Sequence, residues 1–84
     1  MSTIEKLKRE LKRRPKTFDW NDARRILKHE GYEEDATGKT SGSRVRFEDV
    51  EGISVVLHKP HPGNNLKTYV IRSLAEFLEK EGKL

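Results

Sequence analysis

Two arginines and two histidines in the second half of this 84-residue chain are the side chains best suited to chemistry. Arg44 and Arg46 carry guanidinium forks that match phosphate oxygens, and His58 and His61 carry imidazoles that titrate near neutral pH. Together they are the parts needed to cleave an RNA backbone. A neutral imidazole accepts the proton of a ribose 2′-OH, whose oxygen attacks the adjacent phosphate, and an arginine stabilises the negative charge of the transition state. Spacing alone favours a simpler alternative, a solvated sheet face with ordinary surface charge.

Other kinds of reactive site find little support in the sequence. Gly38-Lys39-Thr40 is similar to the end of a P-loop, but Glu33 stands where that motif needs a glycine, so a polar loop is the better interpretation. His58 and His61 have no cysteine and no obvious third carboxylate to join them, so we predict neither a metal ion nor a cofactor. The absence of cysteine also excludes thiol nucleophiles and disulfides.

Alternating side chains predict a β-hairpin that positions these residues. Residues 43–48 and 53–58 each alternate between apolar and polar types, and residues 49–52 turn the chain. If Phe47 lies opposite Ile53, then Val45 lies opposite Val55, and the apolar side chains share one face. The other face of the hairpin then presents Arg44, Arg46, Ser54 and His58.

Residues 1–16 predict a basic leader helix, because Ile4, Leu7 and Leu11 recur at helical spacing before Pro15. This apolar stripe is narrow, so the helix is expected to be loosely attached to a main domain that spans residues 17–84. The leader holds seven Lys or Arg against two Glu, whereas the whole chain has a formal net charge of +4. Such a basic segment fits either a polyanionic partner such as nucleic acid or simple solubility.

The main domain is predicted to contain two helices that flank three strands. Asp19 is expected to cap the start of the first helix and Gly31 its end, and residues 32–37 form a weak edge strand. The last helix spans about residues 67–80, and its side chains available for the core are Tyr69, Val70, Leu74, Phe77 and Leu78. The order helix, helix, three strands, helix indicates an α+β fold, in which a three-stranded antiparallel sheet carries helices on one face and leaves the other face open.

The sequence predicts no association with a membrane. Its first residues lack the apolar region of a signal peptide, and no apolar stretch is long enough to span a bilayer. A chain without cysteine fits a reducing compartment, so we expect a cytoplasmic protein.

An ordered set of short motifs resembles the HicA family of bacterial toxins over residues 17–84. The motifs are Gly31-Tyr32, Gly42-Ser43-Arg44-Val45-Arg46-Phe47, Leu57-His58-Lys59-Pro60-His61-Pro62 and Leu66-Lys67, followed by a closing helix. This resemblance implies a fold like the double-stranded RNA-binding domain and a ribosome-independent mRNA endonuclease. It also implies a HicB antitoxin that covers the active surface. The leader helix lies outside the resemblance.

The chain departs from the family at one position. HicA toxins typically carry Gly-Ser-His at the start of the central strand, and that histidine is taken as catalytic, whereas here Arg44 follows Gly42-Ser43. Arginine stays protonated at neutral pH and cannot act as a general base. His61 stands where the family often has a histidine, so it is the first candidate for the base and His58 is the second. The predicted RNA-binding residues are Lys39, Ser43, Arg44, Arg46, Lys59 and Lys67.

Three functions therefore remain open from the sequence. The first is a toxin that cleaves mRNA without a metal ion and is neutralised by a HicB-like antitoxin. The second is a non-catalytic RNA-binding module of the same fold, which the arginine at position 44 favours directly. The third is a protein-interaction domain that uses an exposed Val56 and the basic leader.

Overall fold

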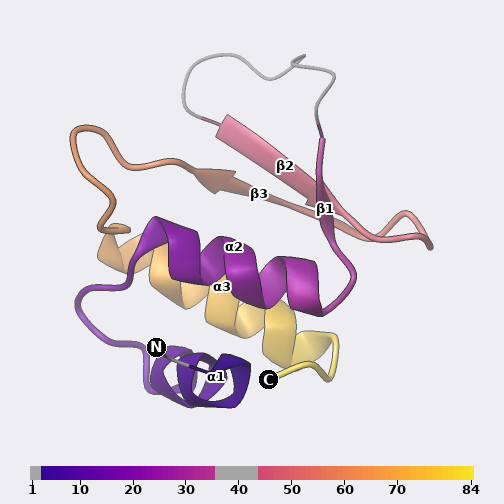
Figure 1. Cartoon of the computed structure of the whole chain (residues 1–84), viewed down its shortest axis with the longest axis horizontal. Coiled ribbons are helices and arrows are strands. Elements are labelled where there is room, and N and C mark those ends of the chain that lie inside the picture. Colours follow the sequence, from indigo (N-terminus) through magenta and orange to yellow (C-terminus); the bar gives the residue numbers. More distant parts are fainter. Residues whose placement is uncertain (1–2, 36–43) are drawn as a thin grey trace.

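Helices cover one face of a small antiparallel sheet in the computed structural model, which describes residues 3–35 and 44–84 (Figure 1). The described elements are α1 (Ile4–Lys12), α2 (Trp20–His29), β1 (Glu33–Glu34), β2 (Arg44–Glu48), β3 (Ser54–His58) and α3 (Thr68–Lys80). The strands pair antiparallel in the order β1-β2-β3. In Figure 1, α2 and α3 lie beneath the sheet, and α1 packs against them on the side away from it. The predicted α+β fold is confirmed, and the described part of the weak edge strand pairs with β2 at β1 and through the N–H of Asp35, which donates to the Arg46 carbonyl at 2.8 Å.

The hairpin of β2 and β3 has the predicted faces but not the predicted register. Phe47 pairs with Val55, and Val45 pairs with Leu57, so the predicted pairing of Phe47 with Ile53 is wrong by two residues. A shift of two residues leaves every side chain on the same face. Phe47 and Leu57 are consequently buried on the helix side, at 0% and 1% exposed.

The turn between the strands explains this register. The N–H of Gly52 donates to the Asp49 carbonyl at 3.1 Å, and the N–H of Asp49 donates to the Ile53 carbonyl at 2.9 Å. The Asp49 carboxylate also accepts from the N–H of Ile53 at 2.9 Å. Gly52 has a φ of +86°, in the left-handed region that glycine enters without steric cost. The result is a three-residue loop closed by a left-handed glycine, which the alternation of side chains alone did not reveal.

Hydrogen bonds and a ring contact join the start of α2 to the sheet and to the connection between β3 and α3. Asp19 caps α2 as predicted, because its carboxylate accepts from the N–H of Asn21 at 2.7 Å. The Trp20 ring packs against the Phe47 ring at a centroid distance of 6.1 Å. The N–H of Trp20 donates to the Asn64 carbonyl at 2.7 Å, and the N–H of Leu66 donates to the Phe18 carbonyl at 2.8 Å. These last two bonds hold the connection between β3 and α3 against the start of α2.

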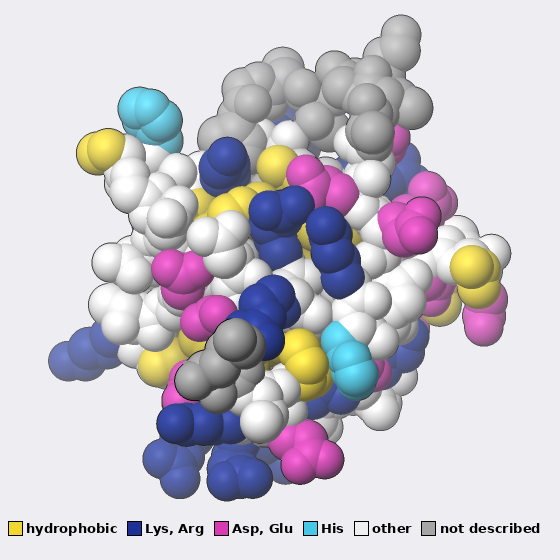
Figure 2. All heavy atoms as spheres, in the orientation of Figure 1, with side chains coloured by type: hydrophobic (Ala, Val, Ile, Leu, Met, Phe, Trp, Pro, Cys, Tyr) yellow, Lys and Arg dark blue, Asp and Glu magenta, His cyan; other side chains and the backbone are white. Residues whose placement is uncertain are grey.

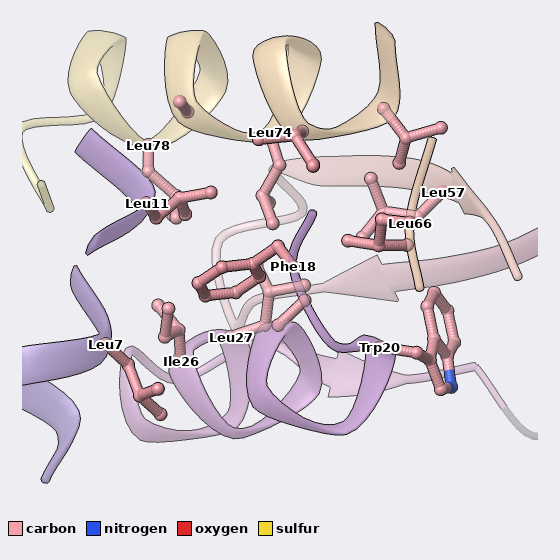
Figure 3. Packing of buried hydrophobic residues seen from close by; sticks show 14 of the residues in the cluster. Leu7, Leu11, Phe18, Trp20, Ile26, Leu27, Leu57, Leu66, Leu74 and Leu78 are labelled. Carbon is pink, nitrogen blue, oxygen red and sulfur yellow. The ribbon is translucent and has the colours of Figure 1, made fainter. Parts of the chain in front are cut away.

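The first helix, α1, belongs to the same core. Leu7 and Leu11 are 1% and 0% exposed, and Figure 3 shows them directed towards Ile26 of α2 and Leu78 of α3. The expectation of a loosely attached helix is therefore wrong. Both leucines are almost fully removed from water and Ile4 packs against the same cluster, so apolar burial ties α1 to the other helices.

Two ion pairs fix α1 and the residues after it to the other helices. The Lys8 ammonium lies 2.7 Å from a Glu30 carboxylate oxygen at the end of α2. The Arg14 guanidinium donates to both carboxylate oxygens of Glu79 in α3, at 2.6 and 2.9 Å. These hydrogen bonds lower the pKa of Glu79 below its ordinary value. The two pairs add polar contacts at the edge of the core, while the buried leucines define which side of α1 faces the other helices.

The burial of α1 predicts a large loss of stability for Leu11→Ala. Removing a fully buried leucine side chain leaves a cavity and lowers the free energy of unfolding by about 2–5 kcal/mol. Lys12→Ala, at the adjacent exposed position, is the matched control and is expected to change it by less than about 0.5 kcal/mol. Urea unfolding followed by Trp20 fluorescence measures both. Equal midpoints for the two variants would show that α1 contributes nothing to the core.

Candidate nucleic-acid interface

The outer face of the sheet carries the side chains that the alternation predicted there. Arg44 pairs directly with His58 across β2 and β3, and Arg46 pairs with Val56. Opposite residues of an antiparallel pair have Cβ atoms about 4.5–5.5 Å apart, so the guanidinium of Arg44 and the imidazole of His58 start from neighbouring positions. Ser54 lies on the same face at the other end of β3.

A hollow of about 140 Å³ lies where β3 ends and α3 begins. It brings together four of the predicted site residues, and its lining consists of His58, Lys59, Pro60, His61, Lys67, Tyr69 and Val70. Both imidazoles thus share one hollow with two lysine side chains. The hydrogen bonds of Trp20 and Leu66 described above shape this hollow, since they hold the β3–α3 connection beside the first turn of α3.

Tyr69 is a member of this site that the sequence analysis assigned to the core. The residue is 57% exposed, and its ring lies 6.4 Å from the His58 ring at an interplanar angle of 61°. Its position could have been found from the helical period, because Val70, Leu74 and Leu78 are all buried and Tyr69 falls on the opposite side of α3. The type of its side chain led to its assignment to the core, whereas its position around the helix axis places it in solvent.

Negative and positive side chains gather at opposite ends of the outer sheet face. A carboxylate oxygen of Glu48 lies 3.4 Å from the Arg46 guanidinium, and Glu33 of β1 pairs with Glu48. Beside them is a wider hollow of about 570 Å³, whose charged lining residues are Glu33, Glu34, Asp35, Glu48 and Asp49. Carboxylates at that end repel phosphate, whereas Arg44 and the hollow at the end of β3 attract it. Arg46 is thus partly neutralised, while Arg44 lies opposite His58.

Two of the predicted RNA-binding residues, Lys39 and Ser43, lie outside the described residues. Within the ranges 3–35 and 44–84, no three histidine, cysteine, aspartate or glutamate side chains gather in a way that could hold a metal ion. In the same ranges, no helix is both long and apolar enough to cross a membrane.

A comparison with protein families finds one match over most of the chain. The family model is described as the HicA toxin of bacterial toxin–antitoxin systems, and it matches residues 20–80. The matched range includes the hairpin and every residue of the hollow, and α1 lies outside it. Comparisons with curated proteins and with solved structures give no match.

Proposed function

This chain belongs to the HicA toxin family of bacterial toxin–antitoxin systems, and we propose that it is an endoribonuclease that cleaves mRNA without a metal ion. The observation that carries this proposal is the hollow at the end of β3, which His58 and His61 line together with two lysines, while Arg44 pairs with His58 across the strands. We assign the activity to residues 17–84, to which residues 1–16 add the basic helix α1.

The two imidazoles supply the proton transfers that RNA cleavage needs. His61 in its neutral form accepts the proton of a ribose 2′-OH, and the 2′ oxygen forms a bond to the adjacent phosphorus. The bond from phosphorus to the 5′ oxygen breaks, and the imidazolium of His58 protonates that leaving oxygen. The products are a 2′,3′-cyclic phosphate and a 5′-hydroxyl. No step needs an electron acceptor or a metal-bound water.

Positive charge near the histidines stabilises the transition state of this reaction. The pentavalent phosphorane carries more negative charge than the substrate phosphate, so a fixed cation beside it lowers the barrier. Arg44 lies directly across the strand pair from His58, and Lys59 and Lys67 line the same hollow. Arg44 therefore binds the reacting phosphate, although it stands where the family usually carries a histidine.

The outer sheet face is also the surface that we propose for a HicB-like antitoxin. Val56 is 41% exposed between the charged residues of this face, so it offers an apolar contact to a protein that covers the sheet. A protein that covers Val56 and Arg44 excludes RNA from the neighbouring hollow. Neutralisation thus requires no change of shape in the toxin.

A non-catalytic RNA-binding module is the second candidate function. The arginine at position 44 favours it, because this residue binds phosphate but cannot accept a proton at neutral pH. Such a module retards RNA in a gel and leaves it intact, whereas the proposed enzyme gives products that persist in EDTA.

The histidines are tested by His58→Ala and His61→Ala. Each substitution is expected to lower the rate of RNA cleavage in EDTA by roughly 100-fold or more, because a proton transfer in the transition state is lost. His29→Ala is the matched control, since His29 is exposed on α2 and outside the hollow. Unchanged cleavage by both hollow variants would refute the proposed roles.

Arg44→Gln tests the stabilisation of the transition state. The expected result is a kcat that falls by roughly 100-fold, with a smaller rise in KM, because the cation acts most strongly on the charge that develops during reaction. Arg72→Gln, at an exposed position of α3, controls for the loss of one positive charge. A higher KM with an unchanged kcat would limit Arg44 to binding the ground state.

Tyr69 is expected to stack on a base next to the cleaved phosphate. Tyr69→Ala then weakens RNA binding by about 1–3 kcal/mol, whereas Tyr69→Phe keeps the ring and the affinity. Fluorescence anisotropy with 2′-O-methyl RNA, which cannot be cleaved through its 2′ oxygen, measures both variants. Equal affinities for the alanine and phenylalanine variants would exclude the stacking role.

A further inference from the structure

The solvent-facing side of α1 and the residues after it form a second basic surface, which we call the α1 basic face. Seven Lys and Arg residues lie between positions 3 and 16. Two of them form ion pairs, Lys8 with Glu30 at the end of α2 and Arg14 with Glu79 of α3. The other five are exposed, and none has a salt-bridge partner among the described side chains; they are Lys6, Arg9, Lys12, Arg13 and Lys16.

The packing of α1 decides which cations point outward. Leu7 and Leu11 face the core, and Lys8 and Arg14 are held in ion pairs with carboxylates of the other helices. Lys6, Arg9 and Arg13 follow one another at spacings of three and four residues, so they share one side of the helix. With Glu10 they line a shallow hollow of about 190 Å³. Figure 2 shows dark blue side chains gathered at its lower edge, over the position of α1 in Figure 1.

The α1 basic face is separate from the candidate active site. Figure 1 places α1 on one side of α2 and α3, and the sheet with its hairpin on the other. Figure 1 looks along the shortest axis, so α1 and the sheet are separated in the plane of the two longer extents of the molecule, 32 and 31 Å, which exceed two Debye lengths of about 8–10 Å in physiological salt. A phosphate bound at α1 therefore has little direct electrostatic effect on one bound beside His58.

We propose that the α1 basic face is a second, sequence-independent binding site for the phosphates of RNA. Five exposed cations against two exposed glutamates, Glu5 and Glu10, give it charge complementary to a polyanion. The inference goes beyond RNA cleavage, because phosphate binding at α1 needs neither histidine. An RNA that reaches both surfaces gains affinity, since its second contact becomes intramolecular.

An anionic membrane is disfavoured as the occupant of this face. A basic helix that lies in a membrane interface inserts an exposed apolar side, but the leucines of α1 are buried in the core. The large hydrophobic side chains exposed within the described residues are Val50, Val56 and Tyr69, all of them outside α1. A hydrophilic polyanion needs no such apolar contact.

The test compares two variants that lose the same charge. Arg9→Gln/Arg13→Gln removes two cations of the α1 basic face, and Lys28→Gln/Arg72→Gln removes two exposed cations from α2 and α3. Anisotropy titrations at several salt concentrations use a 2′-O-methyl RNA long enough to span the molecule. Because this RNA cannot be cleaved through its 2′ oxygen, the result is independent of the proposed catalytic activity.

The α1 variant is expected to bind this RNA roughly tenfold more weakly, and its salt slope is expected to fall by about 1.4, roughly 0.7 for each lost contact to a single strand. The control variant keeps the slope of the parent protein. All four side chains are exposed, so both variants should keep the urea midpoint of the parent.

Two results would overturn the proposal. Equal loss of affinity in the α1 variant and the control would show that only net charge matters. An α1 variant that binds RNA as the parent does, but no longer binds phosphatidylserine vesicles, would assign the face to a membrane.

Discussion

The hairpin of β2 and β3 rests on the helices through Phe47 and Leu57, and the candidate interface depends on this contact. Both side chains are almost completely buried, and Phe47 also meets the Trp20 ring of α2. Because side chains alternate along a strand, burying these two directs Arg44 and His58 to the opposite face. A slip of one residue would send the charged side chains into the core, where ionised groups without partners are very costly. The outward position of the candidate site is therefore enforced by the hydrophobic core.

The second determinant is the connection between β3 and α3. Its main-chain hydrogen bonds to Phe18 and Trp20 hold it beside the start of α2, so that the first turn of α3 reaches the end of β3. Residues separated by up to twelve positions, from His58 to Val70, consequently line one hollow. The carboxylates at the far end of the sheet give the same face a charge gradient, which favours phosphate at the hollow over the hairpin turn.

The helices separate two basic surfaces with different structural origins. One surface depends on strand pairing and on the β3–α3 connection, and lies within the family match over residues 20–80. The other depends on a helix outside that match, which is anchored by Leu7 and Leu11 and joined to the rest of the domain by ion pairs of Lys8 and Arg14. Burial of the leucines leaves the remaining cations of α1 in solvent, as an amphipathic helix requires. A compact chain of 84 residues can thus present positive charge on two sides at once.

The sequence by itself determined the features that depend on local periodicity. Alternation separated Arg44 and His58 from Phe47 and Leu57, and the short polar side chain of Asp19 marked the start of α2. The same local signals predicted the α+β fold and the open sheet face. Such signals succeed because each is set by the geometry of one strand or one helix turn.

Only the tertiary structure decided how these pieces meet. The hairpin register depended on a left-handed Gly52 and on the Asp49 side chain, which alternation does not encode. The exposure of Tyr69 depended on which side of α3 faced the core, and the anchoring of α1 depended on whether the other helices offered its leucines a site. These outcomes are set by contacts between residues that are distant in the chain. The periodicity of one segment cannot show which of its side chains another segment will cover.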